Sequence, residues 1–64
     1  MHEIWLLKRP GKRLDDDVHD ALKFLLREGV ASMRSPDHPA VLLVLDAHWH
    51  RAFQLLVAEN FDIL

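Results

Sequence analysis

Ala40-Val41-Leu42-Leu43-Val44-Leu45 is the longest uninterrupted apolar run in this chain of 64 residues. A short apolar run without polar alternation, bounded by turn residues, is typical of a strand that is buried on both faces of a sheet. The preceding segment, Ser35-Pro36-Asp37-His38-Pro39, contains two prolines and a turn-forming aspartate, which predicts a loop. The rest of the fold is therefore expected to form around a central strand at residues 40–45.

On the N-terminal side of this run, the pattern predicts a strand, a helix and a second strand. Residues 2–9 form the first strand, and Pro10-Gly11 ends it because proline cannot donate a ladder hydrogen bond. The helix is expected to begin at Asp15-Asp16-Asp17, whose carboxylates would cap free backbone N–H groups and favour the positive end of the helix dipole. Gly29 is expected to end it, and residues 30–34 form a short strand. Apolar residues recur along this helix at helical spacing, at Leu14, Val18, Ala21, Leu22 and Leu25.

On the C-terminal side, Asp46 is expected to be the N-cap of a second helix over residues 47–60. The positions i, i+3, i+4 and i+7 of this helix predict a stripe that faces the core, consisting of Trp49, Ala52, Phe53 and Leu56. Residues 61–64, Phe-Asp-Ile-Leu, are expected to form a short edge strand. No linker divides the chain, so residues 1–64 are expected to form a single domain.

The order β-α-β-β-α-β predicts an α+β protein with a ferredoxin-like βαββαβ sandwich. In that arrangement two helices cover one face of a four-stranded antiparallel sheet, and the first and third strands are central. The helices leave the other face open, where Trp5, Leu7 and alternate residues of 41–45 would form an apolar surface. Phe24 and Leu55 lie outside the main stripes of their helices. We therefore expect a homo-oligomer, a dimer formed across the sheet face or its edge, with Trp5, Leu7 and Phe24 at the interface.

Composition excludes several classes of function. The absence of cysteine removes disulfides, thiolate metal sites and cysteine nucleophiles. A formal net charge of −2 gives no basic field for nucleic acid or for an anionic membrane. RNA-recognition sheets stack bases on strand aromatics, whereas residues 40–45 contain none and the first strand has only Trp5. No transmembrane segment or signal peptide is visible, so a cytoplasmic location is expected. No catalytic constellation and no cofactor site is apparent, so an enzyme is not expected.

Two small groups of polar residues are candidate sites. Lys8, Arg9, Lys12 and Arg13 surround the Pro10-Gly11 turn, and Pro10, Gly11, Lys12 and Arg13 before a helix N-terminus could bind a phosphate or carboxylate. Asp15-Asp16-Asp17 at the same helix end would compete with an anion, so a solvated, charge-balanced loop is the alternative. The second group is Asp46, His48 and His50, which could hold a divalent metal on one face of a strand. On a helix His48 and His50 point in different directions, so no metal site is expected.

The order and several motifs of this chain resemble the ACT domain. The resemblance rests on Pro10-Gly11, the span from Val18 to Gly29, the span from Val41 to Asp46, and Asn60-Phe61-Asp62-Ile63-Leu64. ACT domains are small regulatory modules that bind amino acids or similar effectors at dimer interfaces. The resemblance therefore implies an effector-binding dimer, with the effector near the Pro10-Gly11 turn.

Three classes of function follow from these observations. The first is an effector-binding, ACT-like dimer whose ligand is a small molecule such as an amino acid. The second is a module that binds another protein through its apolar sheet face. The third is a metal-binding or pH-responsive module built on the histidines, which include His2, His19 and His38.

Overall fold

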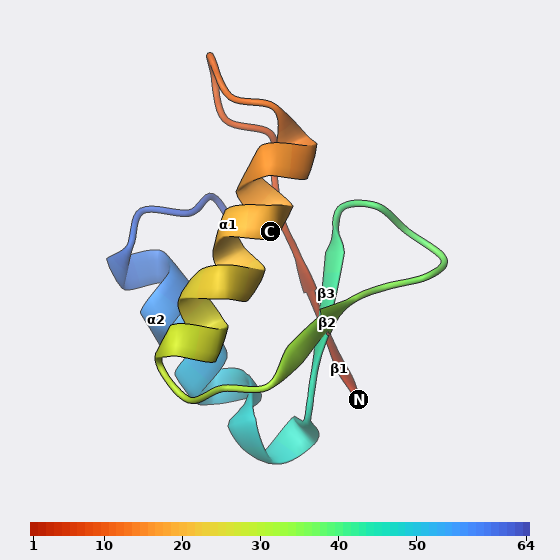
Figure 1. The fold of residues 1–64 in the computed structure, drawn as a ribbon, viewed down its shortest axis with the longest axis vertical. Coiled ribbons are helices and arrows are strands. Elements are labelled where there is room, and N and C mark those ends of the chain that lie inside the picture. The colour runs from red at the N-terminus through yellow and green to blue at the C-terminus, as the bar shows by residue number, and fades with distance from the viewer.

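The computed structural model describes residues 1–64 and contains a small sheet covered by two helices (Figure 1). The strands are β1 (His2–Trp5), β2 (Ser32–Arg34) and β3 (Val41–Val44). The helices are α1 (Leu14–Arg27) and α2 (Trp49–Ala58), and a single 3-10 turn, η1 (Asp46–His48), precedes α2. The prediction of a helix after the first turn is confirmed, with its start one residue earlier than the aspartates.

The sheet is antiparallel and has the order β1-β3-β2. β3 lies in the middle, pairing Leu42 with Ile4 of β1 and Leu43 with Met33 of β2. Both helices lie on the same side of the sheet, with α2 against β1 and α1 against β2 and β3 (Figure 1). The buried central strand predicted from residues 40–45 is thus present as β3.

The prediction of a four-stranded ferredoxin-like sheet is wrong, because the sheet has three strands. The predicted edge strand at residues 61–64 is reduced to one bridge between Leu6 and Ile63, flanked by two backbone hydrogen bonds of 2.9 and 3.0 Å. Asn60 and Phe61 instead form the cap that follows α2, where the Phe61 N–H donates to the Leu56 carbonyl. Only the order β-α-β-β-α, the central β3 and the placement of both helices on one face agree with the expected arrangement.

The predicted strands are all longer than the observed ones. Val30 does not join β2, because its N–H donates to the Leu25 carbonyl at the end of α1. The chain after Leu7 leaves the sheet towards the Pro10-Gly11 turn, so β1 ends well before Arg9. Asp46 makes no side-chain capping bond and lies 3.7 Å from the N-terminal amine. The second helix therefore begins at Trp49 and not at residue 47.

The core lies between the sheet and the helices. Because side chains alternate between the faces of a strand, the even-numbered residues of β1 and β3 face the helices. A single buried cluster results, with residues of β1 and β3 on one side and residues of the helices on the other. Its members are Ile4, Leu6, Val18, Ala21, Leu25, Val30, Leu42, Val44, Ala52 and Leu56. Phe53, predicted to face this core, is 38 % exposed instead.

Both helices end in the same hydrogen-bonded cap. Gly29 after α1 and Asn60 after α2 have positive φ angles of 80° and 67°. At each end the following N–H reaches back five residues, from Val30 to Leu25 and from Phe61 to Leu56, over 2.8 and 3.0 Å. This is the Schellman motif, which satisfies carbonyl groups that the helix leaves free. Val30 and Phe61 then pack against the core that the capped leucines belong to.

Asn60 is therefore expected to tolerate glycine and to reject alanine. A side chain at positive φ costs an ordinary L-residue about 1–2 kcal/mol, a cost that asparagine partly avoids and glycine does not have. We expect Asn60→Ala to lower the free energy of unfolding by about 1 kcal/mol, and Asn60→Gly to leave it equal or slightly higher. Urea unfolding of the three proteins measures this; equal stability of the alanine and glycine variants would contradict it.

Candidate functional site

The Pro10-Gly11 turn projects from one end of the molecule, beyond the N-terminus of α1 (Figure 1). The Lys12 N–H donates to the Arg9 carbonyl over 3.1 Å, and Gly11 has a φ of 74°. A turn with proline at its second position and positive φ at its third suits this sequence. All four predicted ligand residues, Pro10, Gly11, Lys12 and Arg13, are exposed. They therefore form a loop surface and not a pocket.

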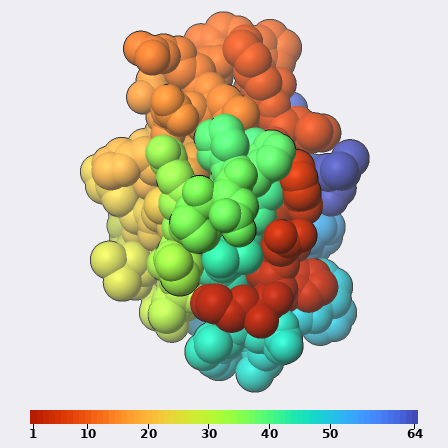
Figure 2. All heavy atoms as spheres, turned by 90° about the vertical axis from the view of Figure 1, so that its right-hand side faces the viewer, coloured from red at the N-terminus to blue at the C-terminus, as the bar shows by residue number.

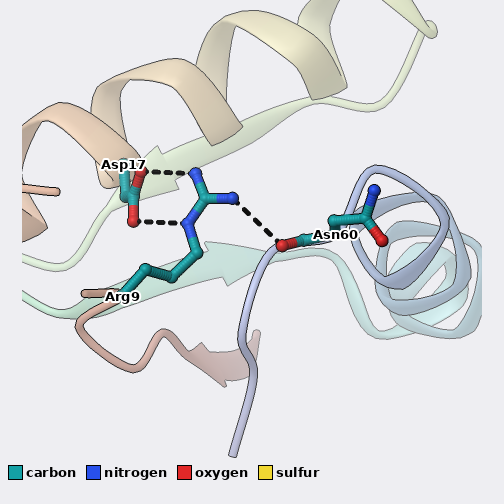
Figure 3. A network of polar contacts seen from close by, with 3 residues as sticks. All are labelled: Arg9, Asp17 and Asn60. Atoms are coloured by element: carbon teal, nitrogen blue, oxygen red, sulfur yellow. Dashed lines mark hydrogen bonds and ion pairs between the residues drawn. The ribbon is translucent and has the colours of Figure 1, made fainter. Parts of the chain in front are cut away.

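Arg9 fixes this loop to the body of the protein (Figure 3). Its guanidinium donates to both carboxylate oxygens of Asp17 in the first part of α1, over 2.6 and 2.9 Å. It also donates to the Asn60 carbonyl over 3.0 Å and lies 5.0 Å from the centre of the Phe61 ring. Arg9 thus joins the loop, α1 and the end of α2. The expected capping of α1 by the three aspartates is wrong, because α1 has no side-chain cap and the carboxylate of Asp17 binds Arg9 instead.

The Arg9–Asp17 pair changes the charge that the loop presents. Asp17 is almost fully buried, and the hydrogen bonds from Arg9 hold the pKa of its carboxyl below the usual value although burial acts in the opposite direction. The same bonds raise the pKa of Arg9. Arg9 is therefore neutralised within the fold. Lys8, Lys12 and Arg13 form no ion pair, so they are the unpaired cations of this loop.

The lowered pKa of Asp17 makes stability depend on acid pH. Its stabilising contribution is complete above the unfolded value of about 3.9 and is lost as pH falls from there through the lower folded pKa. We expect the urea midpoint of the wild type to fall more steeply below about pH 4 than that of Asp17→Asn. If the urea midpoints of the two proteins fell with roughly the same slope between pH 5 and pH 2, the lowered pKa of Asp17 would be contradicted.

The three predicted interface residues lie in different surroundings. Trp5 is half-buried, and its ring centre lies 4.4 Å from that of His38 in the loop between β2 and β3. Leu7 is 45 % exposed. Phe24 lies on the helix side, with its ring centre 6.4 Å from that of Phe61, and packs against the core.

The open sheet face is smaller than its residue pattern predicts. The segment between β2 and β3 lies across the middle of this face, seen as green spheres in Figure 2 beside the red N-terminal strand. Val41, expected to be exposed there, is completely buried. The Ser35 hydroxyl accepts from the Asp37 N–H over 3.2 Å and helps to fix this covering loop. The exposed apolar surface is thus displaced towards the β2 edge and the end of β3.

Two shallow hollows are lined in part by β2 and the residue before it, and sequence reasoning missed both. One lies on the helix side, has a volume of about 370 Å³ and is lined by His19, Leu22, Lys23, Leu26, Ala31 and Ser32. The other, of about 220 Å³, is almost entirely apolar and is lined by Met1, Ala31, Ser32, Met33 and Leu45. Ala31 and Ser32 belong to both. The hollows depend on where α1 and η1 lie relative to the sheet, which no local pattern reveals.

The histidines do not gather. Asp46, His48 and His50 are not brought together with other potential ligands, and no three such side chains in the chain form a group that could hold a metal ion. His2 and His50 each stack on Trp49, with ring centres 4.2 and 3.9 Å away. His19 lines the larger hollow and His38 covers Trp5.

Comparison with known proteins adds no relative. No family model, curated protein or solved structure matches the chain. Neither helix is long and apolar enough to cross a membrane. The resemblance to ACT domains therefore stays a prediction.

Proposed function

We propose that this protein is a small, non-enzymatic interaction module that binds another polypeptide along the outer edge of β2. The observation that carries the proposal is the pair of hollows that meet at Ala31 and Ser32, one between α1 and β2 and the other on the open face across the end of the sheet. The side chains exposed around them are large and apolar: Leu26 is 74 % exposed, Met33 47 % and Leu45 48 %. Large exposed apolar side chains that gather around a hollow are typical of an interaction site.

Strand addition is the mode of binding that this edge favours. β2 pairs with β3 on one side only, so its other side has backbone N–H and C=O groups without strand partners. An added strand would satisfy those groups, and its alternate side chains would lie beside Met33 on the open face and beside the hollow between α1 and β2 on the other face. Main-chain hydrogen bonds would then give affinity, and the apolar linings would give specificity.

Site-specific photo-crosslinking in the native cells tests this proposal without a known partner. Met33 is replaced by p-benzoylphenylalanine, and Glu59, an exposed residue after α2, is replaced in the same way as the control. We expect a discrete covalent adduct from position 33 and none from position 59. The absence of an adduct at position 33 would overturn the proposed function.

The cationic loop supports a second candidate function, the binding of a small anionic effector as the resemblance to ACT domains implies. Lys8, Lys12 and Arg13 are exposed and unpaired around a turn that Arg9 holds in place. Preorganised cations of this kind suit a carboxylate or phosphate. An amino acid would supply the carboxylate.

A thermal-shift panel of free amino acids, inorganic phosphate and nucleotides tests this second candidate. A ligand that binds only the folded state at 100 times its dissociation constant adds about 2.7 kcal/mol of stability, which is a large rise in melting temperature for so small a domain. The rise is expected to disappear in Arg13→Ala and to persist in Arg27→Ala, which removes an exposed arginine from the other end of α1. A flat response across the panel would overturn effector binding for those ligands.

A further inference from the structure

We infer that the chain that pairs with β2 is a second copy of this protein, related by a two-fold axis that passes beside Met33. The inference rests on the proposed function of the β2 edge and adds the identity and register of the partner. The direction of the backbone groups is its first support. The Ser35 N–H donates to the Val41 carbonyl in β3, so the backbone N–H and C=O groups of Met33, two residues earlier, also point to β3. The N–H and C=O groups of Ser32 and Arg34 therefore point to the outer edge.

Only one antiparallel self-pairing uses these groups without conflict. With the axis at Arg34, two arginines would lie directly opposite each other, which is unfavourable. With the axis at Ser32, Arg34 would have to pair with Val30, whose N–H is already bound to Leu25. With the axis at Met33, Ser32 of each copy pairs with Arg34 of the other, and four backbone hydrogen bonds form. Met33 then faces Met33 of the second copy at the closer, non-hydrogen-bonded position.

The side chains around β2 are compatible with this close approach. Arg34 does not present an unpaired charge at the edge, where such a charge would disfavour strand pairing. Its guanidinium donates to the Asp15 carbonyl over 3.3 Å and lies 3.8 Å from the Asp15 carboxylate. On the open face, Met33 borders the hollow that Met1 and Leu45 also line. The two-fold axis brings Met33 of one copy against Met33 of the other. Both Met33 side chains, which are 47 % exposed in the single copy, would then be removed from water together.

The distribution of acidic and basic residues along α1 is compatible with the same two-fold axis. The first half of the helix is acidic, with Asp15, Asp16 and Asp20, whereas its second half has Lys23 and Arg27. α1 lies beside β2, so a two-fold axis perpendicular to the sheet places the two copies of α1 antiparallel to each other. The acidic half of each helix then faces the basic half of the other. A parallel arrangement would instead oppose like charges.

Single-cysteine variants test both the partner and the register, because the chain has no cysteine of its own. Met33→Cys places two thiols opposite each other, and Leu7→Cys is the control, since Leu7 is almost equally exposed at 45 % against 47 % on the same sheet face. Under mild oxidation at about 10 micromolar protein, pairing gives the thiols an effective concentration near millimolar, so Met33→Cys is expected to link about 100 times faster than Leu7→Cys. Ser32→Cys and Arg34→Cys are expected to link slowly, because neither faces its own copy.

Sedimentation velocity of charge variants gives a second reading that does not depend on thiol chemistry. Met33→Glu opposes two carboxylates at the axis and is expected to be monomeric at concentrations where the wild type and Leu7→Glu sediment as dimers. A wild type that is monomeric throughout, with equal linking rates at positions 33 and 7, would overturn the inference. The photo-crosslink separates this failure from that of the proposed function. An adduct of twice the chain mass supports both, an adduct with a different protein overturns the self-pairing alone, and no adduct overturns both.

Discussion

Arg9→Met is expected to destabilise the protein by about 3–5 kcal/mol, because it leaves the carboxylate of Asp17 buried without a partner. The side chain of Asp17 is only 3 % exposed, whereas that of Arg9 is 22 % exposed. The stability of a 64-residue domain is about 3–10 kcal/mol, so this one change removes a large part of it. Urea unfolding at neutral pH, followed by circular dichroism, measures the loss.

The reciprocal change is expected to cost less. In Asp17→Asn the guanidinium of Arg9 keeps the Asn60 carbonyl and the face of Phe61, and water reaches its exposed side. We expect a loss of about 1–2 kcal/mol, and we expect the double variant Arg9→Met/Asp17→Leu to regain most of the stability, since an apolar pair leaves no charge buried. An Asp17→Asn variant less stable than Arg9→Met would contradict this account of the pair.

Leu56→Ala is expected to lower the free energy of unfolding by about 2–5 kcal/mol. Leu56 is completely buried where α2 meets the sheet, and its removal leaves a cavity in a core of few residues. The adjacent Val57 is 51 % exposed, so Val57→Ala is the matched control and is expected to change stability by no more than about 0.5 kcal/mol. Similar effects of the two substitutions would contradict the orientation of α2.

Local patterns predicted the parts of the fold that depend on local chemistry. The apolar run at residues 41–44 became the central strand, and Gly29 ended α1 at positive φ. The prediction of a fourth strand was wrong because Phe61 suits both a strand and a helix cap. In the structure its N–H completes the cap of α2. Val41 was expected on an open face, but the loop from Ser35 to Ala40 folds back over that face, a contact that strand alternation cannot anticipate.

Only the parts of the candidate site that depend on residues close together in the sequence were predictable. Lys12 and Arg13 lie exposed on a turn, as the Pro10-Gly11 pair indicates. The ion pair between Arg9 and Asp17 crosses that turn, whereas the sequence pattern predicted helix capping as the role of this carboxylate. The two hollows that β2 helps to line arise from the packing of separate elements, so no motif within residues 31–33 marks them.

Amide hydrogen exchange at the β2 edge is the measurement that tests the central claim most directly. The N–H groups of Ser32 and Arg34 face away from β3, so they are free in a single copy and hydrogen-bonded in the proposed pair. We predict slow exchange of both at high protein concentration and fast exchange on dilution. Glu3, whose N–H faces outward on the opposite edge beyond the Leu6–Ile63 bridge, should exchange quickly at every concentration. Exchange at Ser32 and Arg34 as fast as at Glu3, whatever the concentration, would contradict the claim.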